Sequence, residues 1–539
     1  MNAGVAPTVR SRLGLLGAFI RDPNAIWIRE MRQSARAGRT PWLIFAATLL
    51  VSLTVCSLGG IVVSAHVSPA KVGLALSQVF FSLAWSVVAL VGPVVAANSV
   101  AAEREGRTWE AILLTGMTPS EIARGKFVAA YTTIALYIAG LAPIAAVPFL
   151  FGGTTATEVI LGFALLMLLA ALAVAFGLAV SSMVSSLRAA LVVTLLLSVL
   201  FSPILFSTFG FGFAAIAHKA WPDVPILPVW LPLAYTRAPF GIAYLVFLMA
   251  APLTSIAIPA WFFYELTVAN LSGTADDRST GLKRWFVVAA IATTSFLVVA
   301  VLLVDRTDID GAYGLVATML FTFTLFAAFL FADEPLVASK RVRTHWARRR
   351  RTALTRWFGP GLGRTTTLVI LITHASFTTL AAAALLRCMP YPGASQKALL
   401  SIVSFTGYGL GFSTFVTGLN SFLRSRNSSA WGVRIITIAV SMAIALLPWA
   451  VAAIAGVITQ QDRAIAIAAP SFTFAPVVLS VRKAYTILPA IACFTGWWFI
   501  GLVLALFGAR RARTAIAEQA NMAAQLDASL AHASPPRAE

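Results

Sequence analysis

Hydrophobic positions along this chain fall into long blocks separated by short polar stretches. Twelve runs are apolar and long enough to cross a bilayer, which takes about 20 residues per helix. They lie near 41–64, 74–97, 127–150, 159–181, 189–216, 240–264, 286–304, 313–332, 366–386, 398–420, 435–458 and 485–508. Lipid offers no water to the backbone, so each run must be a helix that satisfies its own hydrogen bonds. The pattern predicts an all-α polytopic membrane protein with about 12 transmembrane helices, and it excludes a porin-like barrel.

Composition supports this prediction. Hydrophobic residues make up 59% of the 539 residues, and charged residues only 11%. Soluble domains carry roughly 25% charged residues. Three cysteines are too few for a disulfide framework, and we expect none to be bridged.

The basic residues are unevenly distributed among the loops. If both termini are cytoplasmic, the loops on the outer side hold only 9 of the 40 Lys and Arg residues: Lys71, Lys219, Arg237, Arg306, Arg387, Lys397, Arg463, Arg482 and Lys483. That asymmetry is typical of positive-inside topology. The net charge of +20 is therefore better explained by the membrane than by nucleic acid. The densest basic block, Lys340 to Arg351, is expected to meet anionic lipid headgroups.

One stretch, 101–127, interleaves both charge signs with an apolar stripe. We expect two short amphipathic helices joined by a turn at Gly116 to Pro119, with a helix start after Pro119. Such a pair on one face of a membrane protein predicts a docking element for a soluble partner. The alternative is an ordinary solvated loop between two spans.

The same stretch resembles the coupling element of type-2 ABC exporter permeases, which reads E-R-E-x-G-T-x-E-x-L-L-x-T-x-L-S-x-x-E-I-x-x-G-K. Arg107 stands where the family has glycine. The resemblance implies an ATPase-coupling role for Glu103, Arg104, Glu105, Glu110, Leu113, Leu114, Thr115, Pro119, Ser120, Glu121, Ile122, Gly125 and Lys126. The four glutamates are expected to pair with basic groups of the partner, and Ile112, Leu113 and Leu114 to pack against it.

A second motif stands before the first span. Residues 13–40 predict an amphipathic helix on the inner membrane surface. The stretch 24–33 is similar to the family's N-terminal elbow, with Ala25 at the usual proline. The elbow residues are Asn24, Trp27, Arg29, Glu30, Arg32 and Gln33.

The segment between the fifth and sixth runs, His218 to Phe240, contains five prolines and two tryptophans. These residues suit a broken helix lying at the interface. Type-2 ABC exporters have re-entrant or interfacial helices at this position, so an external gate is expected at Trp221, Pro228, Trp230 and Pro232. Simple aromatic anchoring of the loop is compatible with this role.

The runs divide into two sets of six. We expect a cytoplasmic elbow at 1–40, a permease half at 41–264, a cytoplasmic linker at 265–285, a second half at 286–508 and a cytoplasmic tail at 509–539. The second half is interpreted as a degenerate tandem repeat, or else as six accessory spans of unrelated origin. At its coupling position, Ala332-Asp333-Glu334-Pro335 lacks the coupling motif, so its docking element is lost or altered.

The spans lack the groups that harvest energy. All Asp, Glu, Lys and Arg residues fall outside the runs or at their edges, which argues against a secondary carrier or a voltage sensor. His374, inside the ninth run, is better explained as a hydrogen-bonded core residue than as a proton relay. The sequence contains no phosphate-binding loop and no Cys/His metal motif. The chain is thus predicted to be a non-enzyme without a metal or cofactor of its own.

These observations predict the membrane subunit of an ATP-driven ABC exporter in a bacterial cytoplasmic membrane. ATP and Mg²⁺ would be bound by a separate cytoplasmic ABC ATPase, expected as a dimer, and a second permease chain is possible. The route would lie between the two halves or between two chains. Uncharged spans favour an apolar or amphipathic cargo. The alternatives are a non-transporting regulator or scaffold that docks an ATPase and, less favoured, a secondary carrier.

Overall fold

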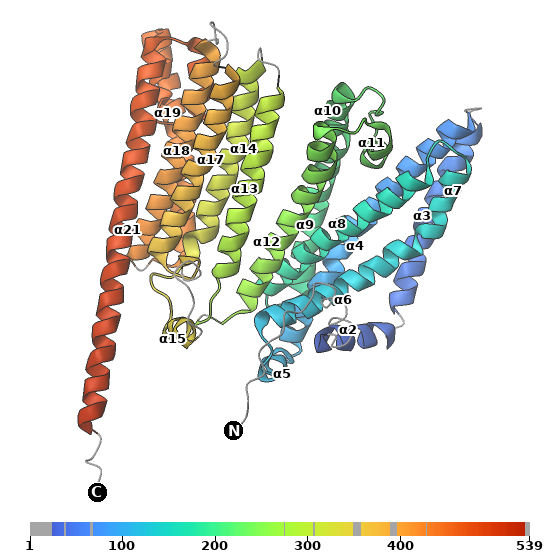
Figure 1. The fold of residues 1–539 in the computed structure, drawn as a ribbon, viewed down its shortest axis with the longest axis horizontal. Coiled ribbons are helices and arrows are strands. Elements are labelled where there is room, and N and C mark those ends of the chain that lie inside the picture. Colours follow the sequence, from blue (N-terminus) through green and yellow to red (C-terminus); the bar gives the residue numbers. More distant parts are fainter. Residues whose placement is uncertain are drawn as a thin grey trace. The chain divides into compact units, whose positions relative to one another are not determined.

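The computed structural model describes residues 24–36, 39–64, 68–273, 275–304, 308–348, 357–388, 396–426 and 428–533. Over this part of the chain the regular elements are helices, and no strand is formed (Figure 1). The chain divides into two compact units, Met1–Gly273 and Thr274–Glu539. Each unit is described by itself below.

Unit 1 begins with a short amphipathic helix and continues with long apolar ones. Its helices are α2 (Ala25–Arg36), α3 (Arg39–Ser64), α4 (Pro69–Glu105), α5 (Trp109–Leu114), α6 (Pro119–Gly140), α7 (Ala142–Leu150), α8 (Ala156–Met183), α9 (Leu187–Ser207), the π-helix η1 (Thr208–Gly212), α10 (Phe213–Ala220), α11 (Leu231–Arg237), the π-helix η2 (Tyr244–Ala250) and α12 (Ala251–Leu271). We call the end that carries α2 and α5 the elbow end, and the end that carries α7 and α11 the cap end (Figure 1).

Unit 2 has a similar succession of long helices. These are α13 (Thr280–Leu303), α14 (Ile309–Leu330), the 3₁₀ turn η4 (Phe331–Asp333), α15 (Lys340–Arg348), α17 (Leu362–Cys388), α18 (Gln396–Ser425), α19 (Ala430–Thr459), the 3₁₀ helices η5 (Asp462–Ala468) and η6 (Phe472–Phe474), α20 (Ala475–Val481) and α21 (Ala484–Ala533). We call the end where α15 lies, between α14 and α17, the basic end.

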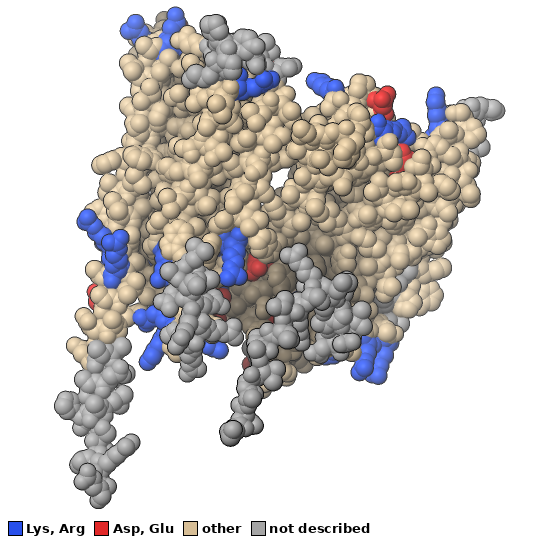
Figure 2. Space-filling view, in the orientation of Figure 1, with Lys and Arg blue, Asp and Glu red and all other residues tan. Residues whose placement is uncertain are grey.

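Eleven helices among the described residues are long and apolar enough to span a membrane. They match eleven of the twelve predicted runs. The remaining run, 41–64, forms α3, whose apolar part Phe45–Ile61 is shorter. Charged side chains in Figure 2 gather near the helix ends of each unit and leave an uncharged belt between them. The prediction of a polytopic all-helical membrane protein is confirmed.

The two units share an order of helix packing. In unit 1 the fourth span, α8, contacts α4, α6 and α12, which are the second, third and sixth spans. In unit 2 the fourth span, α18, likewise contacts α14, α17 and α21. Close approach depends on small residues: a Cβ on Gly177 of α8 would lie 2.1 Å from the Pro93 carbonyl of α4, and one on Gly418 of α18 would lie 2.1 Å from the Gly501 carbonyl of α21. This shared order supports the repeat interpretation, which stays a prediction.

The connection between the units is shorter than the predicted linker 265–285. Helix α12 continues to Leu271, and α13 begins at Thr280. Within the described residues, the predicted elbow helix of 13–40 is seen as α2 followed by the start of α3, and residues 13–23 lie outside the described part of the chain.

Candidate functional site: an ion-paired junction at the elbow end

The segment between α4 and α6 makes two tight turns around the six-residue helix α5. After α4, Arg107 adopts a left-handed conformation with φ 55°, and after α5, Gly116 adopts φ 75°. Glycine tolerates positive φ at no steric cost, which explains why the family pattern has glycine where this chain has Arg107. Here the turn is kept, with arginine bearing the strain.

Helix α6 then begins with a capping box. The backbone N–H of Glu121 donates to Thr118 Oγ1 at 3.3 Å, and the Thr118 backbone N–H donates to Glu121 Oε2 at 2.8 Å. Pro119 occupies the first turn, where its missing N–H costs nothing. The helix start predicted after Pro119 is thus observed. The prediction of two separate short helices was wrong, because α5 is the only short one, Glu103–Glu105 still belong to α4, and the second helix is the start of the long α6.

A buried ion network joins three helices at this junction. The ammonium of Lys126, on α6, is fully buried. It lies 2.7 Å from Glu103 Oε2 on α4 and 3.2 Å from Glu30 Oε1 on α2. It also donates to the Ser99 carbonyl at 3.0 Å and to Ser99 Oγ at 3.2 Å. A buried ammonium persists only when it is paired and hydrogen-bonded, and here all of its partners come from the elbow-end helices.

Arg29 of α2 completes the network from the solvent side. Its guanidinium donates to Glu103 Oε1 and, at 3.1 Å, to Glu30 Oε1. Partial burial lowers the pKa of Arg29, but hydrogen bonds and charge from Glu103 and Glu30 outweigh that effect, so the net pKa is raised. Two cations and two carboxylates thus balance each other where α2, α4 and α6 meet.

Close backbone approach fixes α2 against α6. Asn24 donates through Nδ2 to the Glu121 carbonyl at 2.9 Å, while its Oδ1 accepts the Ile26 N–H at 2.9 Å and caps α2. A Cβ on Gly125 would lie 2.4 Å from Asn24 Oδ1 and 2.9 Å from Ile26 Cβ. Gly125 is therefore required by packing, and the elbow motif and the Gly-Lys end of the coupling motif form one contact.

The same α4 terminus is tied to other helices of unit 1. Arg104 donates to the Ser182 carbonyl at the end of α8, at 2.8 Å, and its guanidinium lies 5.6 Å from the centre of the Trp109 ring. Glu105 Oε2 accepts the N–H of Leu187, the first residue of α9, at 2.8 Å, which places a negative charge at a helix N-terminus. Movement of this terminus would therefore reach α8 and α9 as well as α2 and α6.

The exposed surface of the junction is small and partly apolar. Leu114, the last residue of α5, is 87% exposed, and Glu110 on the same helix is also exposed. Ser120 and Glu121 at the start of α6 are exposed too. An exposed leucine beside charges is what an interface core with a polar rim requires. We call Glu110, Leu114, Ser120 and Glu121 the α5 surface.

The predicted coupling residues divide into three groups. Those on the exposed surface are Glu105, Glu110, Leu114, Thr115, Ser120 and Glu121, with Pro119 partly exposed. Those that hold the junction together are Glu103, Arg104, Ile122, Gly125 and Lys126. The side chain of Leu113 lies outside the described part. Two expectations need correction: Glu103, with 11% of its side chain exposed, pairs with Lys126 and Arg29 rather than facing a partner, and Ile112 is 5% exposed and packs inside unit 1.

Elbow residues likewise differ in role. Asn24, Arg29 and Glu30 bind the junction, whereas Arg32 and Gln33 are exposed and Trp27 is half-buried. Sequence reasoning missed Ser99 and Ser182. Both contribute carbonyl oxygens to the junction, and a carbonyl acceptor leaves no mark in a residue pattern.

At the cap end, the predicted gate residues lie in a packed segment. Trp221 and Trp230 are each 9% exposed, Pro232 is buried and Pro228 is half-buried. Trp230 Nε1 donates to the Phe209 carbonyl in the π-helix η1 at 2.8 Å. The side chain of Gln78, on α4, makes two hydrogen bonds to the backbone of Val229: it accepts the N–H at 2.8 Å and donates to the carbonyl at 3.0 Å.

A second attachment of this segment uses a buried carboxylate. Glu158, 4% exposed at the start of α8, accepts the Thr236 hydroxyl at 2.7 Å and lies 3.5 Å from Arg237 Nε. The segment Trp221–Arg237 is therefore fastened to α4 and to α8. We call it the cap.

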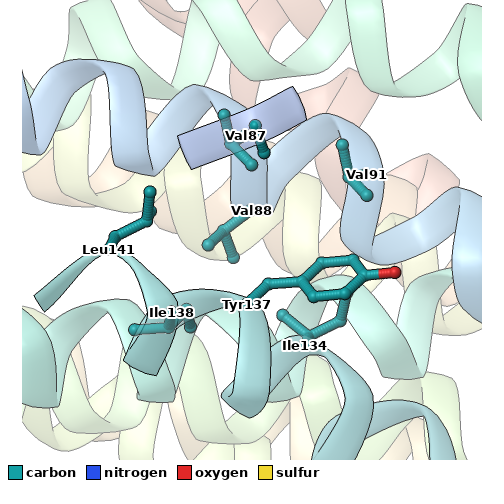
Figure 3. Close-up of a pocket in the computed structure, with 8 residues that line it drawn as sticks. Val87, Val88, Val91, Ile134, Tyr137, Ile138 and Leu141 are labelled. Carbon is teal, nitrogen blue, oxygen red and sulfur yellow. The ribbon is translucent and has the colours of Figure 1, made fainter. Parts of the chain in front are cut away.

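A narrow cavity lies among α3, α4 and α6. Ala47, Val87, Val88, Val91, Ile134, Tyr137, Ile138 and Leu141 line a volume of about 10 Å³, and Figure 3 shows the Tyr137 ring along one wall. A cavity of this volume has room for about one water molecule. The cavity is too small to be a cargo site in the conformation described.

His374 is held by hydrogen bonds between α17 and α21. Trp498 Nε1 donates to His374 Nε2 at 2.8 Å, and His374 Nδ1 lies 2.8 Å from the Ile370 carbonyl. Because an indole N–H can only donate, Nε2 must accept and Nδ1 carries the proton. Both ring nitrogens are thus hydrogen-bonded, as predicted, but His374 is half-buried and Trp498 is 41% exposed, so the residue is not part of a buried core.

The spans, the junction and the cap together define the class of protein: a polytopic helical membrane protein with a polar junction at one end of a six-helix unit. Residues 63–233, from the end of α3 to α11, match the family described as ABC-2 family transporter protein. This match, which lies inside unit 1, supports an ABC-2 type transporter permease. Neither a curated protein nor a solved structure matches the chain.

Proposed function

We propose that the chain is the membrane-spanning subunit of an ATP-driven exporter and that a separate cytoplasmic ABC ATPase docks on the α5 surface. The observation that carries this proposal is the combination of an 87% exposed Leu114 on α5 with a buried ion network that joins the helices on either side of α5. The family match over residues 63–233 supports a transporter component. The elbow end is then cytoplasmic, in a bacterial inner membrane.

Force would enter through a short rigid path. A displacement of α5 acts on the ends of α4 and α6, which Lys126 and Glu103 hold together. The same pairings extend to α2 through Arg29 and Glu30. Coupling is carried by packed helices and salt-bridge networks, so this network can pass a displacement of α5 to α2, α4 and α6.

The opposite end of α4 is hydrogen-bonded to the cap through Gln78. One helix of 37 residues therefore contacts both the ATPase junction and the cap. We propose that the cap closes the external mouth and that movement of α4 opens it. The cargo is expected to be apolar or amphipathic, because the spans carry no charged residue away from their ends.

The experiment is co-purification of the chain with the ABC ATPase encoded beside it in its genome, in detergent. Leu114→Asp with Glu110→Arg should weaken binding at least about 30-fold, since a central interface anchor contributes about 2 kcal/mol or more. It should also abolish stimulation of ATP hydrolysis. The matched control is Leu150→Asp, which changes an 80% exposed leucine at the cap end.

Unchanged binding and stimulation in the double variant would sink the docking assignment. Binding lost equally in the Leu150→Asp control would show that the loss is one of folding. Ion-gradient-driven transport by the chain alone would instead favour a secondary carrier, and binding without any transport in proteoliposomes would favour a regulator or scaffold.

A further inference from the structure

The position in unit 2 that corresponds to the ATPase junction is built differently. It lies between α14 and α17, the second and third long helices of that unit, just as α5 lies between α4 and α6. In its place stand the 3₁₀ turn η4, a Glu-Pro turn and helix α15. Two of its features bear on whether an ATPase can dock there.

First, unit 2 closes this end with an internal ion pair of its own. Glu334 is 4% exposed, and its Oε1 lies 2.7 Å from the fully buried ammonium of Lys283. Lys283 also donates to the Gly359 carbonyl at 2.7 Å, and Glu334 accepts the Gly361 N–H at 2.8 Å. The lysine comes from the first helix of the unit, α13, whereas in unit 1 it comes from α6. The Glu-Pro turn is thus bonded both to α13, through Lys283, and to the segment that precedes α17, through Gly361.

Second, α15 turns its apolar side inward. Val342 and Trp346 are 5% and 6% exposed and form a cluster with Ala338, and Arg364 of α17 lies over the Trp346 ring at 5.5 Å. The helix is held further by Ser339, which donates to the Ala275 carbonyl at 2.5 Å. It therefore offers no large apolar side chain comparable to Leu114 among its described residues.

The outer side of α15 is cationic. Lys340 and Arg341 are exposed, and Arg341 lies 3.1 Å from Asp276. Arg343 donates to Gln519 of α21 at 3.0 Å. The α5 surface, by contrast, carries Glu110 and Glu121. An ATPase groove that binds the acidic α5 surface and its leucine is expected to be basic and partly apolar. Such a groove would be repelled by the basic side chains of α15 and would find no exposed large apolar side chain among its described residues, which disfavours binding.

We infer that each chain offers one ATPase-docking surface, the α5 surface of unit 1, and that unit 2 does not take part in docking. This inference rests on the proposed function. An exporter that works with two ATPase protomers would then need two of these chains, each contributing one α5 surface.

The test is the stoichiometry of the complex of the full chain with its neighbouring ABC ATPase, measured by native mass spectrometry. ATP is left out, so that nucleotide-driven dimerisation adds no undocked protomer. The expected ratio is one ATPase protomer per chain. Leu114→Asp should reduce occupancy at least 10-fold, whereas Lys340→Glu with Arg341→Glu should leave it within 2-fold of the unmodified chain.

Three results would overturn the inference. These are two ATPase protomers per chain, one protomer retained in Leu114→Asp, or loss of a protomer in the α15 variant. A failure of the proposed function gives a separate result, since the unmodified chain would then bind no ATPase at all, and both statements would fall together.

Discussion

At the residue scale, the central feature is a buried lysine whose charge is paired with carboxylates inside the protein. Lys126 has a fully buried side chain and four polar partners on α2 and α4. Sequence similarity places it in the coupling motif but does not say which way it points. Lysines are almost never fully buried unless they are paired, so only the meeting of Glu103 and Glu30 around it in three dimensions explains its position.

Removing one partner of this network should destabilise unit 1. We expect Lys126→Met to lower the free energy of unfolding by about 2 kcal/mol, because Glu103 loses its buried partner and keeps only the exposed Arg29. The double change Lys126→Met with Glu103→Leu should cost less than Lys126→Met alone. Thermal unfolding of the purified protein measures both. The control is Arg124→Met, an exposed cation on the same helix, which should have little effect.

Gly125 gives a second prediction at this scale. Gly125→Ala should push α2 away from α6, since the new methyl would overlap Asn24 Oδ1. Limited trypsin digestion after Arg29 and Arg32 should then be faster. Gly60→Ala is the matched control, because a Cβ there meets nothing within 4 Å. Equal digestion rates in the two variants would show that α2 does not depend on this contact.

At the element scale, α4 links two attachments at opposite ends of unit 1. Its elbow end bears Glu103 and Arg104, and its cap end bears Gln78. Eleven of the twelve predicted spans are found as long apolar helices, and they could be predicted from sequence because burial in lipid needs long uncharged helices. The hydrogen bonds between Gln78 and the cap could not be predicted, because a side-chain amide can hydrogen-bond to any backbone group and its partner lies 151 residues away. Likewise, α5 was too short for its boundaries to show in a hydrophobic period.

Loss of the hydrogen bonds from Gln78 should make the cap more mobile without disturbing the spans. In Gln78→Leu, hydrogen–deuterium exchange of the peptide that contains Val229 should be at least several-fold faster, because its N–H loses its acceptor. Ser86→Ala is the control, since the Ser86 hydroxyl bonds only within α4 in the contacts described. Unchanged exchange at Val229 would contradict the attachment of the cap to α4.

At the scale of the whole molecule, the two units share an order of packing but differ in the surfaces at their α5 and α15 positions. In unit 1, the charges at the elbow end are paired and Leu114 is exposed. In unit 2, Glu334 forms an ion pair with Lys283, and Val342 and Trp346 are buried. Sequence alone showed that the second coupling motif was missing. It also showed the basic block Lys340 to Arg351. It could not show the ion pair at this position, because Lys283 on α13 and Glu334 in the turn after η4 are 51 residues apart.

The most direct test of the account is photo-crosslinking from one position of α5. A photoreactive p-benzoylphenylalanine replaces Leu114 in one variant and Leu150 in the other, and each is irradiated with the neighbouring ABC ATPase in membranes. The account predicts an adduct with the ATPase from position 114 and none from position 150. An adduct from position 150, or none from position 114 while the two proteins still co-purify, would contradict it.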